Sequence, residues 1–361
     1  MRKQFYGKTK LETLKKADEY QQKLNIGTLC TDEKLTLQQW FKTWLFEYKV
    51  NEIRPSTLSK YEGLYRNYIK NTQIGMVKLK DLKAYNLQSY YNLLTRDNNK
   101  TPDTIKTLNK VIKAALTQAT TEQYIFLNPC NHVILPKIAP KSEIQILTLD
   151  EQLKFIEAIQ GHRQRVVFLL GLGTGLRLGE LLGLKWANID LVRMELTVRR
   201  TLKKVAIIDL KSGTKVEGSK TKIIEQLPKT EYSARTVPIP SNLIKELKKH
   251  MMMHYKERLE AKDLYVNNDL VFPNEIGEPT DERSLKRSYE RILKRAGIEH
   301  KKFHCLRHTF ATRLFEREVP LKTVSILLGH SDIKITADIY THVMPSEKIK
   351  AVDKLNDLFA L

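Results

Sequence analysis

Two histidines, an arginine and a tyrosine lie close together near the C-terminal end of this sequence. His304 and Arg307 are three positions apart, so on a helix they share one face and can approach the same ligand. His330 follows Gly329, the residue type that most readily closes a helix in the left-handed conformation. Tyr340 comes next, across a turn-like segment and the start of another helical run. The stretch therefore combines cationic groups with a phenol.

These side-chain types are suited to chemistry on a phosphate. A guanidinium matches two phosphate oxygens at once, and an imidazole can donate a hydrogen bond to a third. A phenol has a pKa of ~10 in water, so it needs cationic surroundings to become a nucleophile near neutral pH. The pattern predicts a bound phosphate whose phosphorus is attacked by Tyr340.

Other interpretations of the histidines are weaker. A zinc site made of His304, His308 and His330 lacks a carboxylate or cysteine at ligand spacing. Arg307 would also repel the ion. We therefore predict no metal site, and we interpret His308 and His342 as structural or surface residues.

Helices predicted from apolar spacing must position these groups. The segments 304–318 and 321–328 have helical periodicity, and the second ends at Gly329. Further upstream, the almost wholly apolar segment 165–174 predicts a buried helix. Gly175 allows a sharp turn after it, and Arg177 then stands at the start of the next buried helix. An arginine among apolar neighbours needs an anion to offset its desolvation.

Strand-like segments follow at 195–202 and 235–239, before a predicted helix at 241–262. The segment GTKVEGSKTK between the strands is interpreted as an exposed insertion, and PKTEYSARTVPI as the return of a hairpin. Thr148 and Glu151 form a predicted capping box that opens this second domain. The Pro- and Lys-rich stretch before it has the composition of a linker.

The composition favours a globular protein that binds a polyanion. The 361 residues carry 62 Lys and Arg against 41 Asp and Glu, a formal net charge of +21. No apolar run approaches the ~20 residues that span a bilayer, and MRKQFYGKTK lacks the core of a signal peptide. We therefore expect a cytoplasmic protein. Cys30, Cys130 and Cys305 are far apart and odd in number, so we expect reduced thiols.

The N-terminal third is predicted to be helical after a short start. Residues 2–8 predict one strand, and 10–24 a helix. From Leu35 to about Pro136, amphipathic segments predict a bundle of four helices. Its basic side chains are candidates for DNA contact, with a merely solvated helix face as the alternative: Arg54, Lys60, Arg66, Lys106, Lys110 and Lys113.

Four motifs and a tyrosine resemble the catalytic domain of tyrosine recombinases, the phage and conjugative-transposon integrases. The motifs are TGLRLGELLGLKWANID, PKTEYSARTVPI, HCLRH and LLGHS, and the tyrosine is Tyr340, before THV. The helical segment resembles the core-binding domain of that family, with RPSTLSKYEGLYRNYI as its best local match. The start of the chain resembles the last part of the family's arm-binding domain. Whether this remnant binds DNA or serves as a linking or regulatory helix is left open.

The resemblance implies a multidomain fold: an all-α core-binding domain and a mostly α (α+β) catalytic domain with a small β-sheet or hairpin. The expected limits are a partial arm-binding segment at 1–30, the helical domain at 34–136, a linker at 137–146, the catalytic domain at 147–345 and a tail helix at 346–361. In the family this tail packs on a neighbouring protomer, and self-docking is the alternative.

The resemblance also implies catalytic roles for six residues. Arg177 and Arg307 clamp the non-bridging phosphate oxygens, and His330 donates to the phosphate. Lys229 is the general acid for the departing 5′ oxygen, with Lys220 and Lys222 as rivals. His304 is the general base for Tyr340, the nucleophile. Glu180, one helical turn beyond Arg177, is expected to orient the arginines or a histidine.

The expected function is therefore that of a site-specific recombinase. It forms a 3′-phosphotyrosine without metal, ATP or cofactor, and acts as a tetramer on double-stranded attachment sites to integrate or excise a mobile element or prophage. An excisionase and a host DNA-bending protein are further expected partners. The alternatives are a non-catalytic DNA-binding protein on the same fold and a type IB topoisomerase.

Overall fold

The computed structural model describes residues 5–7, 9–25, 34–97, 99–137, 144–209, 214–215, 221–227, 234–343, 352–353 and 355. The chain divides into two compact units. The helical unit comprises Met1–Lys141 and Val205–Thr221, and the C-terminal unit comprises Ser142–Lys204 and Lys222–Leu361. The architecture confirms the predicted fold class of helical bundle followed by a mostly α domain with small sheets. The finer domain limits stay a prediction.

The helical unit is built from short helices that start at well-defined caps. Thr36 and Gln39 form a capping box, Thr101 caps the longest helix of the bundle, and Pro55 and Pro102 occupy first turns. The elements are α1 (Lys10–Asn25), α2 (Leu37–Thr43), the π-helical η1 (Trp44–Tyr48), α3 (Pro55–Tyr68), α4 (Gln73–Met76), η2 (Leu79–Asp81), α5 (Ala84–Arg96), α6 (Pro102–Thr121), η3 (Pro129–His132), β4 (Ile208–Asp209) and β5 (Thr214–Lys215).

Aromatic side chains form much of the core of this unit. Phe41 stacks on Tyr65 with ring centroids 5.7 Å apart, and the Trp40 indole donates to the Ala115 carbonyl at 2.8 Å. The predicted apolar face of the first bundle helix is therefore confirmed, although the helix changes to π-helical hydrogen bonding at Trp44. Residues 5–7 are not in a strand, contrary to the prediction for 2–8; the remainder of that segment lies outside the described residues.

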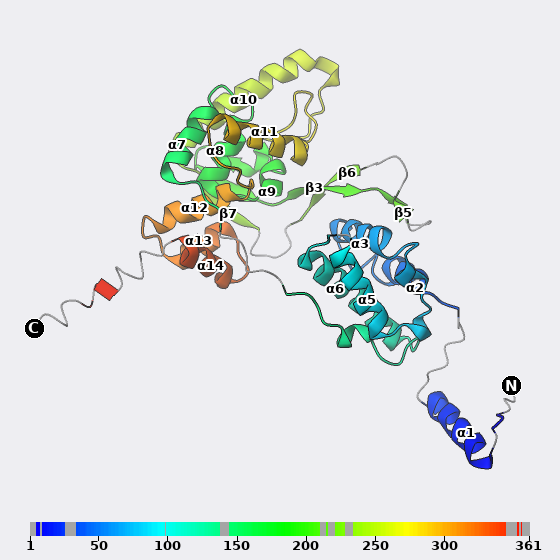
Figure 1. Ribbon diagram of the computed structural model, residues 1–361. Helices are drawn as coiled ribbons and strands as arrows, with labels where there is room; N and C mark the ends of the chain where they lie inside the picture. The colour runs from blue at the N-terminus through cyan, green and yellow to red at the C-terminus, as the bar shows by residue number, and fades with distance from the viewer. Residues whose placement is uncertain are drawn as a thin grey trace, which may run out of the picture. The chain divides into compact units, whose positions relative to one another are not determined.

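The C-terminal unit places a three-stranded antiparallel sheet, in the order β1-β2-β7, among helices (Figure 1). Its elements are α7 (Leu149–Ala158), α8 (Arg165–Thr174), α9 (Leu178–Leu182), η4 (Trp186–Asn188), β1 (Ile189–Asp190), β2 (Glu195–Val198), β3 (Thr201–Ala206), β6 (Thr221–Gln226), β7 (Arg235–Pro238), α10 (Ser241–Ala261), η6 (Lys262–Leu264), α11 (Glu282–Arg295), α12 (Cys305–Phe315), α13 (Leu321–Leu328) and α14 (Ile333–Val343). The strands β3 and β6 pair in a separate ribbon.

Local signals in the sequence explain where these elements begin and end. Thr148 and Glu151 form the predicted capping box, with the Thr148 amide donating to Glu151 at 2.8 Å. The buried helix predicted at 165–174 is α8, and the helix predicted at 321–328 is α13. Gly329 ends α13 with φ +64°, in the left-handed conformation that the sequence predicts.

Two apolar clusters hold the C-terminal unit together. The larger surrounds α8, with α12 packed against it. The smaller joins α12, α13 and α14, which lie together in orange to red in Figure 1, around Phe315, Val324, Leu328 and Ile339. Since His304, His330 and Tyr340 belong to these three helices or their ends, the small cluster fixes their mutual placement.

Gly175 is the tightest backbone position next to these helices. It ends α8 with φ +64°, and a Cβ built there would lie 2.4 Å from Cδ1 of Phe310 and 3.0 Å from Cδ2 of Leu328. The position therefore requires glycine for two reasons: its conformation and the space around it.

We predict that Gly175→Ala destabilises the protein strongly. The left-handed backbone costs about 1–2 kcal/mol for a residue with a Cβ, and overpacking against Phe310 adds about 1–3 kcal/mol. Gly161→Ala is the matched control, because Gly161 has φ +68° but nothing within 4 Å of its Cβ position. Urea unfolding of both variants measures the difference. Equal losses of unfolding free energy would contradict the packing part of the prediction.

Candidate active site

Each predicted catalytic residue in the described part of the chain stands at a helix end or on one of three packed helices. Arg177 precedes α9, and its amide donates to the Glu180 carboxylate at 2.9 Å, which fixes the first turn. Arg307 is on α12, and His304 precedes that helix. His330 follows α13, and Tyr340 is on α14.

A buried carboxylate joins two arginines at the centre of the site. Arg177 Nη1 donates to Glu180 Oε1 at 2.8 Å, and Arg235 Nη2 donates to Glu180 Oε2 at 3.0 Å. Burial alone would raise the pKa of the Glu180 carboxyl, but the charge and hydrogen bond of Arg235, together with Arg177, lower it below its ordinary value. Glu180 therefore stays ionised and in contact with both guanidiniums.

Three arginines donate hydrogen bonds to backbone carbonyls at the C-terminal end of α13. Arg235 Nε donates to the Leu327 carbonyl at 2.7 Å, Arg307 Nη2 to Leu328 at 2.6 Å, and Arg177 Nη2 to Gly329 at 3.3 Å. The preceding carbonyls, of Ser325 and Ile326, accept from the amides of His330 and Gly329 in a Schellman closure. The helix end thus has a partner for each of its last four carbonyls, and its negative dipole faces cations.

Arg307 is the most buried of the three, with 2% of its surface exposed. Nη1 donates to the Gly175 carbonyl at 2.7 Å and Nη2 to Leu328, so in the described part of the chain its hydrogen bonds go to backbone carbonyls. Burial, and then the charge of Arg177, lower the pKa of this guanidinium well below its ordinary value. A buried charge held only by neutral acceptors is stabilised when an anion binds beside it.

The two histidines of the site are neutral at pH 7. Partial burial, followed by the charges of Arg307 and Arg177, lowers the pKa of His330 to about 3. Desolvation by the surrounding protein, followed by His308 and Arg307, lowers the pKa of His304 to about 4, although part of this side chain is exposed. The fully buried Thr336 hydroxyl lies 2.7 Å from His330 Nδ1. If this hydroxyl donates, the ring proton is on Nε2, where it can donate to an oxyanion.

Tyr340 lies one helical turn beyond Thr336 on α14. Its ring packs edge-on against Phe315, with centroids 5.1 Å apart, at the border of the small apolar cluster. The helix that carries the phenol is therefore tied to His330 by the Thr336 contact and to α12 by the Phe315 contact.

The three candidate lysines differ in what the structure describes. Lys229 and Lys220 lie outside the described residues. Lys222 is exposed on β6. The choice of Lys229 as the active lysine stays a prediction.

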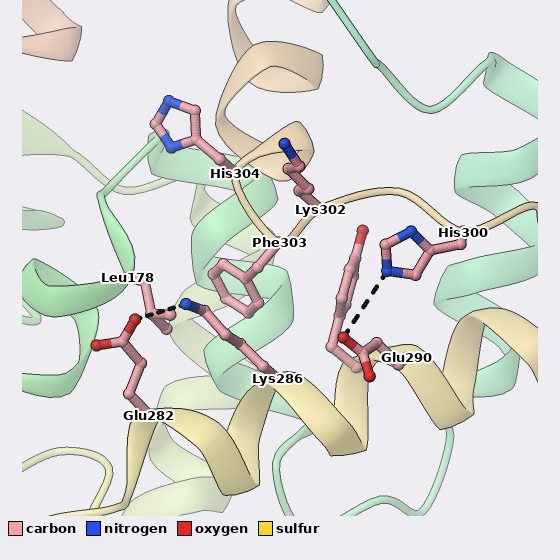
Figure 2. A pocket seen from close by; sticks show the side chains of 9 residues that line it. Leu178, Glu282, Lys286, Glu290, His300, Lys302, Phe303 and His304 are labelled. Carbon is pink, nitrogen blue, oxygen red and sulfur yellow. Dashed lines mark hydrogen bonds and ion pairs between the residues drawn. The ribbon is translucent and has the colours of Figure 1, made fainter. Parts of the chain in front are cut away.

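Open space adjoins both ends of the site. A pocket of about 370 Å³ lies beside His304 and Lys302, over Phe303 and the α11 face that carries Lys286, which pairs with Glu282 (Figure 2). A second pocket, of about 480 Å³, adjoins His330. Solvent therefore reaches both histidines, whereas Arg307 between them is almost completely buried.

Arg235 lies in the motif PKTEYSARTVPI, but it was not among the catalytic residues predicted from the sequence. The available signal was its place at the start of a short alternating segment, where Arg235 and Val237 point inward and the residues between and beyond them outward. An inward-facing arginine on such a strand indicates a buried ion pair, and here the partner is Glu180.

The candidate DNA-contacting residues belong to the helical unit. Lys60, Arg66, Lys110 and Lys113 are exposed, whereas Arg54 and Lys106 are half-buried. Arg66 pairs with the buried Glu62 at 3.1 Å.

Neither a metal site nor a membrane span is found in the described part of the chain. No group of three or more His, Cys, Asp or Glu side chains there is arranged to hold a metal ion. The described helices include none with the length and apolar character needed to cross a bilayer.

Comparison with known proteins points to one family. The phage integrase family matches residues 145–347, and the N-terminal SAM-like domain of phage integrases matches residues 36–95. A XerC-like tyrosine recombinase from Caldanaerobacter subterraneus is 48% identical, covering 99% of this chain and 92% of the relative. The ICEBs1 integrase of Bacillus subtilis is 26% identical, covering 72% of this chain and 66% of its own.

Solved structures of two integrases have a fold similar to that of this chain. The Tn1549 transposon integrase in complex with a circular intermediate DNA superposes with a TM-score of 0.70 at 20% identity, covering 88% of this chain and 99% of that one. A lambda integrase tetramer bound to a Holliday junction gives a TM-score of 0.60 at 19% identity, covering 92% and 88%. The motifs, the fold and the relatives together show that this chain belongs to the phage integrase family and is a site-specific recombinase of the tyrosine type.

Proposed function

We propose that this protein cuts and rejoins DNA strands at specific sites through a 3′-phosphotyrosine on Tyr340, and thereby integrates and excises a mobile element or prophage. The observation that carries the proposal is the arginine cluster. Arg307 is buried against backbone carbonyls, and both Arg307 and Arg177 contact the end of α13, directly before His330. Such a preorganised group of cations is suited to an oxyanion whose charge grows in the transition state.

The two arginines and His330 bind the scissile phosphate in this proposal. Arg177 and Arg307 donate to the non-bridging oxygens, and Nε2 of the neutral His330 adds a further donor. The site is fixed before DNA arrives, because Arg177 and Arg307 already hold α13. Little reorganisation is then needed when the phosphate binds.

The remaining groups move protons. His304 accepts the phenolic proton of Tyr340 as its oxygen forms a bond to phosphorus, and Lys229 gives a proton to the 5′ oxygen as the old P–O bond breaks. The products are a 3′-phosphotyrosine and a free 5′ hydroxyl. Because the phosphate ester is conserved, a 5′ hydroxyl from another duplex can reverse the step without ATP.

DNA binding and assembly follow from the same proposal. The exposed basic side chains of the helical unit contact the phosphate backbone of the DNA; they include Lys60, Lys110 and Lys113. The similar lambda integrase is solved as a tetramer on a Holliday junction, which supports a tetramer here. The tail at 346–361 exchanges between protomers in this assembly; of that tail, Val352, Asp353 and Leu355 are described. An excisionase and a host DNA-bending protein are proposed as accessory partners.

Tyr340→Phe is predicted to abolish the covalent adduct and to leave DNA binding unchanged, because the substitution removes only the nucleophilic oxygen. The measurement is a denaturing gel of protein incubated with a nicked suicide DNA site, beside an electrophoretic mobility shift. Tyr255→Phe, an exposed tyrosine on α10, is the matched control and should form the adduct. An adduct with Tyr340→Phe would reject the assignment.

A sulfur leaving group distinguishes Lys229 from its rivals. Lys229→Ala is predicted to slow cleavage of ordinary DNA by about 10²–10⁴-fold, the usual contribution of a general acid. DNA with sulfur at the 5′ bridging position should be cleaved at nearly the wild-type rate, since a thiolate leaves without protonation. Lys220→Ala and Lys222→Ala serve as controls, expected to cleave both DNAs normally. The same sulfur rescue seen instead with Lys222→Ala would transfer the role to Lys222.

The lowered histidine pKa values predict how the free protein responds to pH. A free histidine, with a pKa of ~6.5, is mostly protonated at pH 6, whereas His304 and His330, with pKa values of about 4 and 3, should stay neutral. The unfolded chain then binds protons that the folded protein does not. The free energy of unfolding should therefore fall as the pH drops from about 6.5 toward 4.

An NMR titration of protein labelled in its histidine rings measures the two pKa values. The ring signals are assigned with the variants His304→Asn and His330→Asn. A midpoint for either ring near pH 6.5 would contradict the prediction. Bound DNA should shift both midpoints upward, because the phosphate charge favours the protonated rings.

A further inference from the structure

Arg235 is a buried arginine in the same cluster for which the proposed reaction has no role. It starts β7, pairs with Val198 in the sheet, and its side chain is only 5% exposed. A guanidinium at an inward strand position pays a large desolvation cost, so its partners must be strong ones.

Two of its partners belong to the segments that carry the proposed phosphate ligands. Nη2 donates to Glu180 Oε2 at 3.0 Å, and Glu180 in turn holds Arg177 at 2.8 Å. Nε donates to the Leu327 carbonyl at 2.7 Å, three residues before His330. One side chain therefore connects α9 with the end of α13.

The two arginines that share Glu180 differ in exposure. The Arg177 side chain is 38% exposed, so its free edge can meet a ligand from solvent. The Arg235 side chain is 5% exposed and borders the pocket beside His330. Its hydrogen bonds join the segments that carry Arg177 and His330, so we interpret its role as acting through these two residues.

We propose that Arg235 is a positioning residue for strand cleavage: it shares the charge of Glu180 and holds Leu327, and so directs Arg177 and His330 toward the phosphate. This inference rests on the proposed recombinase function. Without Arg235, Glu180 would pair more strongly with Arg177, because a buried carboxylate is stabilised by the cation that remains beside it. Arg177 would then be less available to the phosphate oxygens, and the end of α13 would lose one of its three holds.

Single-turnover cleavage of the suicide DNA, with the full-length protein in excess, tests the proposal. Arg235→Met should lower the cleavage rate at saturating protein by about 10–100-fold, the usual loss when a group that orients an active-site ligand is removed. The DNA dissociation constant should not change. Arg235→Lys keeps the charge but cannot reach both acceptors with a planar fork, so its rate should be intermediate.

Arg165→Met is the matched control. Arg165 also joins a glutamate, Glu246 at 3.0 Å, to a backbone carbonyl, that of Ile156 at 3.2 Å, within the same unit. The control should lose stability in a thermal melt yet cleave at the wild-type rate. If Arg165→Met and Arg235→Met slow cleavage equally, the role of Arg235 is general stability and the proposal is overturned.

A double variant separates positioning from folding. With Arg235→Met and Glu180→Gln combined, the carboxylate that would draw Arg177 away is absent, so cleavage should be no slower than in the slower single variant. Multiplied losses would overturn the proposal. If Arg235→Met does not fold, Arg235→Lys decides: slowed cleavage at unchanged DNA affinity supports positioning, and a wild-type rate rejects it. A wild-type protein that forms no adduct would instead reject the proposed function itself.

Discussion

The end of α13 is the constraint on which the candidate active site depends. A helix leaves its last four carbonyls without partners, and here two of them accept from Arg235 and Arg307. The arginines in turn need acceptors, because a guanidinium buried without them would be too costly. Helix end and arginine cluster therefore stabilise each other. His330 follows directly, so the same contacts that satisfy the backbone also place the proposed phosphate ligand.

Glycine makes this arrangement sterically possible. At Gly175 the chain leaves α8 in a left-handed conformation close to Phe310, and its carbonyl accepts from Arg307. At Gly329 the same conformation closes α13. A Cβ at Gly175 would overlap with the Phe310 ring, so the close packing of α12 on α8 depends on glycine at this position. Tight packing therefore contributes, together with Glu180, to holding these like charges near one another.

Local structure and site chemistry were predictable to different extents. The limits of α8 and α13, the Thr148 capping box and the left-handed Gly329 followed from apolar spacing and cap residues. The turn to π-helix at Trp44 did not, because hydrogen-bond shifts inside a helix depend on packing against other elements. The place of Arg235 in the site was not predicted, for a related reason. Its strand is four residues long, and its partner Glu180 is far away in the sequence.

The sequence by itself determined the residue types, their order along the chain and the helices that carry them, since these depend on spacing, caps and chemical character. Its motifs also indicated the family, and the comparisons confirmed it. Only the tertiary structure decided that three arginines share one helix end, that Glu180 serves two of them, and that both histidines are neutral. Burial and long-range contacts set these properties, and neither is encoded in local spacing.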